Sequence, residues 1–301
     1  MIYLTKETQN LLFNEVRNCK DSIMLISAFC KQSALEEIDG ALSSTVVDKK
    51  MLIRFKTEDV AKGVTDYSVI EYCFEHNWKL FFNFDLHAKT YIVDKTRCIL
   101  GSANMTGKGL GLNPINSNIE ISGICTLDRE DLKKIESIFD SSLEMTKDIK
   151  NELDTIFSQL EKNTNKATNV SWDEVLKSKY NPKSYVLFTH EFPKTQRPTH
   201  ILEDLEFLEI TDYCDEAVVS EKFKNCKCVK WLESILRNKE DKTIYFGELS
   251  SMLHNTVLND PIPYRKDIKQ LLSNLLSWIE YFKYDKFLID VPRHSQRIRL
   301  A

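Results

Sequence analysis

Residues 87–109 read HAKTYIVDKTRCILGSANMTGKG, and this stretch decides the fold of the first half of the chain. Two extended runs, at residues 90–93 and 98–100, flank the turn-prone residues 94–97. Short runs of this kind on either side of a turn are typical of a β-hairpin. We therefore expect two antiparallel strands here.

Four polar side chains occupy comparable places on the two expected strands. His87 and Lys89 are separated by one residue, so both point to the same face of their strand. We expect Val93 to oppose Cys98, which brings polar residues of the second strand opposite those of the first. The side chains that then share one face are His87, Lys89, Ser102 and Asn104.

This set of side chains suits the binding and attack of a phosphate. The ammonium of Lys89 supplies positive charge to the non-bridging oxygens, and Ser102 and Asn104 supply neutral hydrogen-bond donors. The imidazole of His87 serves as a nucleophile or proton carrier. Because these groups provide both the charge and the attack, the chemistry needs no metal, and we expect no cofactor.

The spacing H-x-K-x4-D-x6-G-S-x-N resembles the signature of the phospholipase D superfamily without a missing position. It is carried by His87, Lys89, Asp94, Gly101, Ser102 and Asn104. The resemblance implies a phospholipase D-like α-β-α sandwich with a central mixed sheet, and cleavage through a phosphohistidine. It also implies that Asp94 and Gly101 are structural, and that Glu120 is catalytic, hydrogen-bonding the imidazole and fixing its tautomer.

The mechanism implied by this resemblance uses two histidines, one that attacks phosphorus and one that protonates the leaving oxygen. The chain has six histidines but only one H-x-K. Phospholipases and cardiolipin synthases of the superfamily usually carry two copies, whereas its small bacterial nucleases and related restriction endonucleases pair one copy across a twofold axis. We therefore expect a homodimer with the active site at the twofold interface.

The rest of the first half alternates helical and extended patterns, which is typical of an α/β fold. Helical patterns at 5–19, 33–42 and 67–76 alternate with strand-like runs at 22–27, 50–55, 78–84 and 119–124. Asp128 then caps a helical pattern that runs from Leu132 to Leu160. The polar stretch 161–170 indicates a domain boundary.

We expect three parts: a catalytic and dimerisation domain at 1–162, a linker at 163–180, and a smaller, mainly helical C-terminal domain for target recognition or partner binding at 181–301. From Cys228 the expected order is helix 229–237, strand 243–246, helix 248–254, helix 264–282 and strands 286–290 and 296–300. That order looks like a winged-helix module, a relative of the helix-turn-helix readers.

Basic residues near the end are candidates for phosphate contacts with nucleic acid, expected to be DNA. They are Arg265, Lys266, Lys269, Arg293, Arg297 and Arg299. The helix at 264–282 is also rich in apolar residues, so contact with a partner protein stays open. Cys226-Lys227-Cys228 with Cys214, His190 and His200 lacks the spacing of a zinc knuckle, so we expect free thiols and no metal.

The composition, with 42% hydrophobic and 29% charged residues, excludes a largely disordered chain. We find no apolar run of about 18 residues and no secretory pattern in MIYLTKETQN, so we expect no membrane association and a cytoplasmic location. Scattered cysteines fit a reducing compartment. The net charge of -4 gives no bulk attraction to nucleic acid.

These patterns predict a metal-independent phosphodiesterase that cleaves nucleic acid, of the kind found in bacterial restriction or phage defence. Two alternatives remain open. A lipid phosphodiesterase or phosphatidyl transferase is one, although the missing second motif counts against it. The other is a nuclease subunit that is active only when a partner protein docks on the C-terminal domain.

Overall fold

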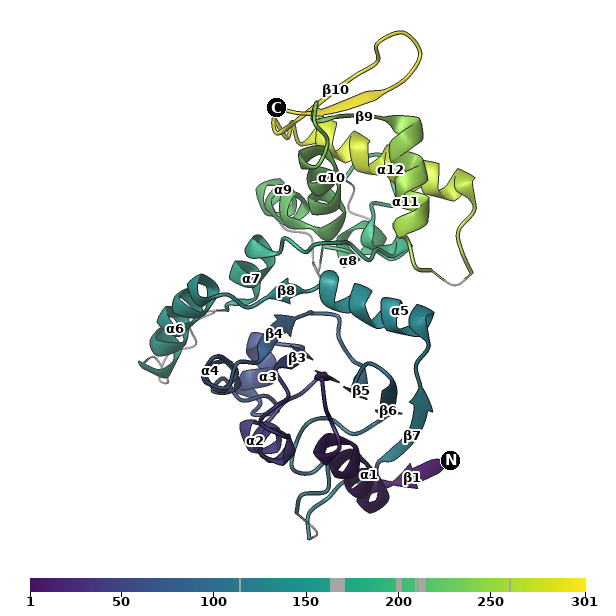
Figure 1. Ribbon diagram of the computed structural model, residues 1–301. Helices are drawn as coiled ribbons and strands as arrows, with labels where there is room; N and C mark the ends of the chain where they lie inside the picture. Colours follow the sequence, from purple (N-terminus) through teal and green to yellow (C-terminus); the bar gives the residue numbers. More distant parts are fainter. Residues whose placement is uncertain (114, 163–170, 199–201, 209, 211–214, 260) are drawn as a thin grey trace. The chain divides into compact units, whose positions relative to one another are not determined.

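The computed structural model describes residues 1–301 except 114, 163–170, 199–201, 209, 211–214 and 260 (Figure 1). The described residues form two compact units, Met1–Lys183 and Ser184–Ala301. Each unit has a hydrophobic core of its own.

The first unit is built on an eight-stranded mixed sheet with the order β1-β7-β6-β5-β2-β3-β4-β8. The strands are β1 (Ile2–Leu4), β2 (Ser22–Ser27), β3 (Asp48–Ile53), β4 (Lys79–Phe82), β5 (Lys89–Val93), β6 (Arg97–Gly101), β7 (Ile121–Thr126) and β8 (Leu143–Glu144). The pairs β2–β3 and β3–β4 are parallel, and the other pairs are antiparallel. The expected central mixed sheet is thus confirmed.

Helices cover both faces of this sheet (Figure 1). They are α1 (Thr5–Arg17), α2 (Gln32–Ala41), α3 (Thr57–Ala61), α4 (Val69–Glu75), α5 (Arg129–Asp140), α6 (Lys147–Lys162) and α7 (Asp173–Lys179). All six residues of β2 are buried, because alternate side chains enter the two cores. Leu25 packs with α1, α2 and α4, whereas Met24 and Ile26 pack with α5. This layering confirms the α-β-α sandwich.

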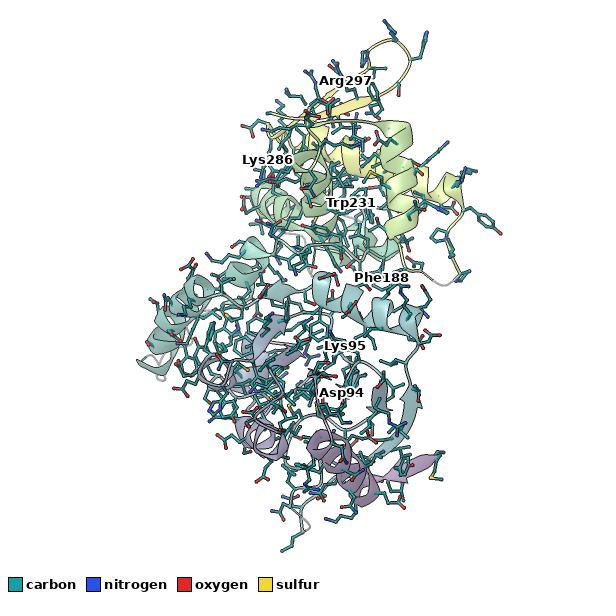
Figure 2. The ribbon with its side chains drawn as sticks, viewed as in Figure 1. Asp94, Lys95, Phe188, Trp231, Lys286 and Arg297 are labelled. Atoms are coloured by element: carbon teal, nitrogen blue, oxygen red, sulfur yellow. The ribbon has the colours of Figure 1, made fainter. Side chains whose placement is uncertain are left out.

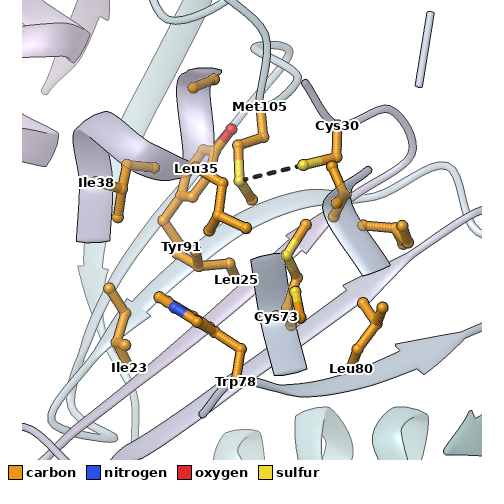
Figure 3. Close-up of a cluster of buried hydrophobic side chains, with 14 of the residues drawn as sticks. Ile23, Leu25, Cys30, Leu35, Ile38, Cys73, Trp78, Leu80, Tyr91 and Met105 are labelled. Atoms are coloured by element: carbon orange, nitrogen blue, oxygen red, sulfur yellow. Dashed lines mark hydrogen bonds between the residues drawn. The ribbon is translucent and has the colours of Figure 1, made fainter. Parts of the chain in front are cut away.

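Figure 3 shows the larger of these two cores, where Ile23 and Leu25 of β2 lie near Tyr91 of β5 and Trp78. Cys30 Sγ contacts the sulfur of Met105 at 3.8 Å, which ties the loop after β2 to the loop after β6. Both loops carry residues of the candidate site described below. The apolar contact therefore helps to fix their relative position.

The helical pattern expected from Leu132 to Leu160 is interrupted in the structure. Asp128 caps α5 as predicted, because its carboxylate accepts from the backbone N–H of Glu130 and Asp131 at 2.8 and 2.9 Å. The helix ends at Asp140, and β8 then pairs with β4 before α6 begins. One continuous helix is thus wrong, since edge pairing of the sheet prevails over helical periodicity in this segment.

Residues 171–183 pack with the first unit. The indole of Trp172 is buried, stacks on Phe55 at 5.4 Å between ring centroids, and donates to the Phe55 carbonyl at 3.3 Å. Residues 163–170 of the expected linker lie outside the described residues. Burial of the Trp172 ring against Phe55 explains why this segment belongs to the first unit. The polar residues around Trp172 gave no sign of this burial in the sequence.

The second unit contains a three-stranded sheet with the order β10-β11-β9. Its elements are η1 (Thr189–Glu191), α8 (Leu202–Glu206), α9 (Glu216–Asn225), α10 (Lys227–Arg237), β9 (Thr243–Tyr245), α11 (Phe246–Thr256), α12 (Arg265–Tyr281), β10 (Phe287–Asp290) and β11 (Arg297–Leu300). From α10 onward this is the predicted winged-helix order. No helix among the described residues has the length and apolar character needed to cross a membrane.

Candidate active site

The predicted hairpin forms from β5 and β6, but its register differs by one residue from the expected one. Val93 pairs with Arg97, one residue before the expected partner. The turn is the cause: Asp94 and Lys95 adopt positive φ angles of 50° and 55°, and the Thr96 N–H donates to the Val93 carbonyl at 3.2 Å. Two central residues with positive φ form the tight turn that strand twist favours.

This register overturns the expected common face of the four polar residues. Lys89 begins β5 and pairs with Ser27 of β2. Continued along β6, the register brings Gly101 rather than Ser102 opposite Lys89, and a one-residue shift exchanges the faces of a strand. His87 precedes β5, so it opposes no residue of β6. The four residues instead lie at the ends of β5 and β6 and in the adjoining segments.

The first of these contacts joins His87 and Lys89. Lys89 Nζ lies 3.2 Å from Nδ1 and 3.3 Å from Nε2 of the imidazole, and it donates to the His87 carbonyl at 2.6 Å. The imidazole is exposed and the lysine is partly buried. An anion that approaches the ring therefore meets the ammonium as well.

A second cation lies within electrostatic range of Lys89. Burial lowers the pKa of the Lys89 ammonium and the charge of Arg54 lowers it further, while the Glu120 carboxylate acts in the opposite direction. Arg54 follows β3 and donates to both oxygens of the buried Asp59 carboxylate at 2.8 and 2.7 Å. Its guanidinium also lies over the Phe29 ring, 4.9 Å from the centroid.

The side chain of Asn104 is held by its carbonyl oxygen. Asn104 Oδ1 accepts from the Phe29 N–H at 3.2 Å and lies 3.4 Å from Ser27 Oγ. Ser27 is fully buried and also accepts from the Met105 N–H at 2.9 Å. Within the described part of the chain, Asn104 Nδ2 has no hydrogen-bond partner. The amide thus presents free donors, as a phosphate oxygen would require.

Ser102 and Glu120 form a separate pair. Ser102 Oγ donates to Glu120 Oε2, and Asn118 Nδ2 donates to Glu120 Oε1 at 3.0 Å. Glu120 is buried, and its backbone N–H donates to Thr5 Oγ1 at 2.9 Å. Among the described residues, no hydrogen bond joins Glu120 to His87 of the same chain. The contact implied by the resemblance is therefore not formed within one chain.

Residues 12–143, which hold all of these groups except Thr5, match the family described as cardiolipin synthase, PLD-like domain. This part of the chain belongs to the phospholipase D superfamily. No curated protein matches the chain.

Solved structures resemble the phospholipase D-like unit at low identity. NucT from Helicobacter pylori is 19% identical over 48% of this chain and 98% of its own, with a TM-score of 0.36. The phospholipase D family member Nuc from Salmonella typhimurium is 16% identical over 48% and 96%, with a TM-score of 0.37. Phosphatidylserine synthase from Haemophilus influenzae Rd KW20 is 15% identical over 56% and 46%, with a TM-score of 0.39.

Asp94 and Gly101 of the phospholipase D-like unit make contacts of a structural kind. Asp94, labelled in Figure 2, accepts from the backbone N–H groups of Lys20, Asp21 and Ser22 at 2.8 to 3.2 Å. It thus ties the hairpin turn to the start of β2. A Cβ at Gly101 would lie 2.4 Å from Ser122 Oγ, so only glycine allows β6 and β7 to approach this closely.

The basic candidates of the second unit fall into two groups. Arg265, Lys266 and Lys269 lie on α12 and line a pocket of about 430 Å³. Arg297, labelled in Figure 2, and Arg299 both donate to the Asp290 carboxylate. The exposed Arg293 lies between β10 and β11 with a φ of 64°.

Of the cysteines and histidines that were considered as a zinc site in the sequence, the structure describes Cys226, Cys228 and His190. Cys226 Sγ and Cys228 Sγ contact each other at 3.3 Å. Cys214 and His200 lie outside the described residues. His190 stacks on Phe188, with 5.5 Å between the ring centroids.

Ser27 and Arg54 are two residues of the site that the sequence did not reveal. Ser27 ends a strand that is otherwise nearly all apolar, SIMLIS, and a buried hydroxyl there needs partners. Arg54 follows the buried end of β3 directly. Both could have been found in the sequence as polar residues at the end of an apolar strand. Loops begin at such strand ends, and functional side chains often lie there.

Proposed function

We propose that the phospholipase D-like unit is a metal-independent phosphodiesterase that cleaves nucleic acid through a phosphohistidine intermediate. The observation that carries this proposal is the exposed imidazole of His87 with the Lys89 ammonium 3.2 and 3.3 Å from its ring nitrogens. A nucleophile and a cation at this spacing can contact one phosphate. The bacterial restriction and phage-defence nucleases are the group of enzymes that this activity fits best.

The first step forms a bond between an imidazole nitrogen of His87 and phosphorus, and breaks the bond between phosphorus and the leaving oxygen. A second imidazole gives its proton to that oxygen. In the second step the same imidazole takes a proton from water, whose oxygen attacks phosphorus and releases His87. Each step conserves charge and needs no redox partner.

Two groups of the site suit the charge that develops on the phosphoryl oxygens. Lys89 supplies a positive charge and Asn104 Nδ2 supplies free N–H donors, whereas Ser102 donates its hydroxyl proton to Glu120. Donors fixed in position before the reaction stabilise a transition state without reorganising. Ser27 and Phe29 hold the Asn104 amide in this way.

The second imidazole comes, in our proposal, from a second copy of the chain. Only His87 stands in an H-x-K pattern among six histidines. Within one chain, in the part that the structure describes, Glu120 bonds Ser102 and Asn118 and leaves His87 without a carboxylate partner. Pairing two copies across a twofold axis would supply the missing proton donor.

Nucleic acid is favoured over lipid as the substrate because the chain carries a single motif. By the resemblance, phospholipases and cardiolipin synthases place two copies in one chain. The second unit, with its winged-helix order of elements, also supports a nucleic-acid target. Phospholipid hydrolysis is the competing outcome of the test below.

The test uses the purified full-length protein in excess EDTA with labelled single-stranded DNA, double-stranded DNA, RNA and phospholipid vesicles. His87→Ala is compared with His190→Ala, which removes an exposed imidazole of the second unit. We expect nucleic-acid cleavage that EDTA leaves intact, that His87→Ala abolishes and that His190→Ala retains. Release of a lipid headgroup without nucleic-acid cleavage would show that the substrate is a phospholipid. Full activity of His87→Ala would refute the site.

A further inference from the structure

Helix α12 presents two unlike faces. Its apolar side chains enter the core of the second unit, and the fully buried ones are Ile268, Leu272, Leu275, Leu276, Trp278 and Ile279. The exposed residues of its N-terminal half are Arg265, Lys266, Asp267, Lys269 and Gln270. In the sequence, the apolar residues of this helix left contact with a partner protein open. In the structure these residues pack in the core of the second unit.

The cations on this face are uncompensated. Arg265, Lys266 and Lys269 form no ion pair within the described residues. With Phe246, Gln270 and Ser273 they line the pocket of about 430 Å³. Asp267 belongs to the same turn, but at about 100° per residue it falls outside the arc that the three cations share. The face thus concentrates positive charge on a chain whose net charge is -4.

The β10–β11 hairpin differs in this respect. Arg297 donates to Asp290 through Nε and Nη2 at 2.9 and 2.7 Å, and Arg299 donates to the same carboxylate at 2.9 Å. Two of the basic residues singled out in the sequence therefore hold the hairpin together. Of the six basic residues singled out in the sequence, the ones without an ion pair among the described residues lie on α12 and at Arg293.

We propose that the exposed face of α12 binds double-stranded DNA by lying in the major groove. An α-helix with its side chains is about 10–12 Å wide and the groove is about 12 Å wide. Arg265, Lys266 and Lys269 would contact phosphates. Gln270 Nε2 donates to Asn274 Oδ1 at 2.9 Å, and the amide oxygen of Gln270 would face base edges. The site lies on the second unit and does not rest on the chemistry proposed for His87.

The same geometry selects DNA over an RNA duplex. The major groove of A-form RNA is deep and narrow, so side chains on a helix cannot enter it. Tyr264, which precedes α12 and is 82% exposed, offers a hydroxyl to the backbone. The alternative ligand is an acidic protein surface. Such a surface would bind the cations of α12 without the helix entering a groove.

The test measures binding of the full-length His87→Ala protein to a labelled DNA duplex of about 20 base pairs, two helical turns, by fluorescence anisotropy in EDTA. The triple variant Arg265→Gln/Lys266→Gln/Lys269→Gln is added to this background. A control triple, Lys239→Gln/Lys242→Gln/Lys283→Gln, removes the same charge elsewhere on the second unit. Circular dichroism and thermal melting check that both variants fold.

We expect the α12 triple to weaken duplex DNA binding tenfold or more and the control triple to change it less than threefold. The slope of log Kd against log salt should fall by roughly 0.9 for each phosphate contact removed. An RNA duplex of the same sequence should bind more weakly and respond less to the α12 triple. Equal effects of the two triples, or an equal loss for DNA and RNA, would overturn the proposal.

Discussion

The Lys89 ammonium is nearly equidistant from the two ring nitrogens of His87, at 3.2 Å from Nδ1 and 3.3 Å from Nε2. The contact joins the first residue of β5 to the segment that precedes it, and a third bond to the His87 carbonyl at 2.6 Å fixes the arrangement. A phosphate that reaches the imidazole therefore meets the cation at the same time. The nucleophile and the cation that would stabilise the transition state therefore both belong to residues 87–89.

Removal of the Lys89 charge should reduce the rate far more than it weakens binding. Loss of one preorganised group that stabilises a transition state costs about 10²- to 10³-fold in kcat. We expect Lys89→Ala to lose activity on this scale in steady-state assays, and Lys89→Met, which keeps the apolar stem, to behave alike. Lys62→Ala, an exposed lysine of the same unit, is the control. A rate within a few-fold of wild type in Lys89→Ala would contradict the role.

The fall of kcat/KM at alkaline pH should follow the deprotonation of Lys89. Burial and Arg54 lower the pKa of Lys89, so its cation is lost at a lower pH than that of an ordinary lysine, whose pKa is about 10.4. Arg54→Gln/Asp59→Asn replaces the ion pair by a neutral pair and removes one cause of the shift. We expect the alkaline limb of kcat/KM to move to higher pH in this variant.

The control for that shift is Glu58→Gln/Lys62→Gln, which neutralises an exposed ion pair on the same segment. Its alkaline limb should coincide with that of the wild type. An unmoved limb in Arg54→Gln/Asp59→Asn would show that Lys89 does not control the alkaline limb.

Asp94 should stabilise the first unit in a pH-dependent way. Burial raises the pKa of its carboxyl, but hydrogen bonds from Asp21, Ser22 and Lys20 outweigh burial and lower the pKa below the usual value of about 3.9. The contribution is therefore fully present above about pH 5 and is lost as pH falls through the folded-state pKa.

The variant Asp94→Asn keeps a residue that tolerates positive φ and removes the charge. We expect a loss of about 1–2 kcal/mol in unfolding free energy at neutral pH, measured by urea denaturation, and a smaller difference in acid. Asp21→Asn, in the turn that Asp94 holds, should show neither effect. A loss that persists unchanged at low pH would argue against the charge as its source.

A mixed dimer tests whether two chains form one site. Wild-type and His87→Ala subunits carrying different tags are co-expressed, and the heterodimer is isolated through both tags. Because each phosphate needs two imidazoles in our proposal, the heterodimer should have less than a tenth of wild-type activity. Half of the wild-type activity would show that each chain works alone, and a stable active monomer would lead to the same conclusion.

The chemistry-bearing residues were predictable from the sequence, but their arrangement was not. His87 and Lys89 are neighbours in sequence, so any extended backbone brings them together. The contact of Ser102 with Glu120 depends on the pairing of β6 with β7. The register of β5 against β6 depends on the positive φ angles of Asp94 and Lys95. Asp and Lys do not reveal such angles as glycine would, and the sequence-based register was therefore one residue off.

The helices and strands from α10 to β11 were predicted almost to their ends, because each has a clear period and ends at a turn signal. The roles of the basic residues there were not predictable. Arg297 and Arg299 both reach Asp290 on the neighbouring strand, whereas Lys266 and Lys269 have no ion-pair partner among the described residues. Sequence spacing does not show which cations find a partner.

The stereochemical course at phosphorus tests the central claim most directly. The protein cleaves a DNA substrate with one phosphorothioate of a single configuration at the scissile position, in water enriched in heavy oxygen, and the configuration of the product is determined. Two successive in-line displacements, first by His87 and then by water, each invert phosphorus. We predict net retention of configuration, and net inversion would contradict a covalent histidine intermediate.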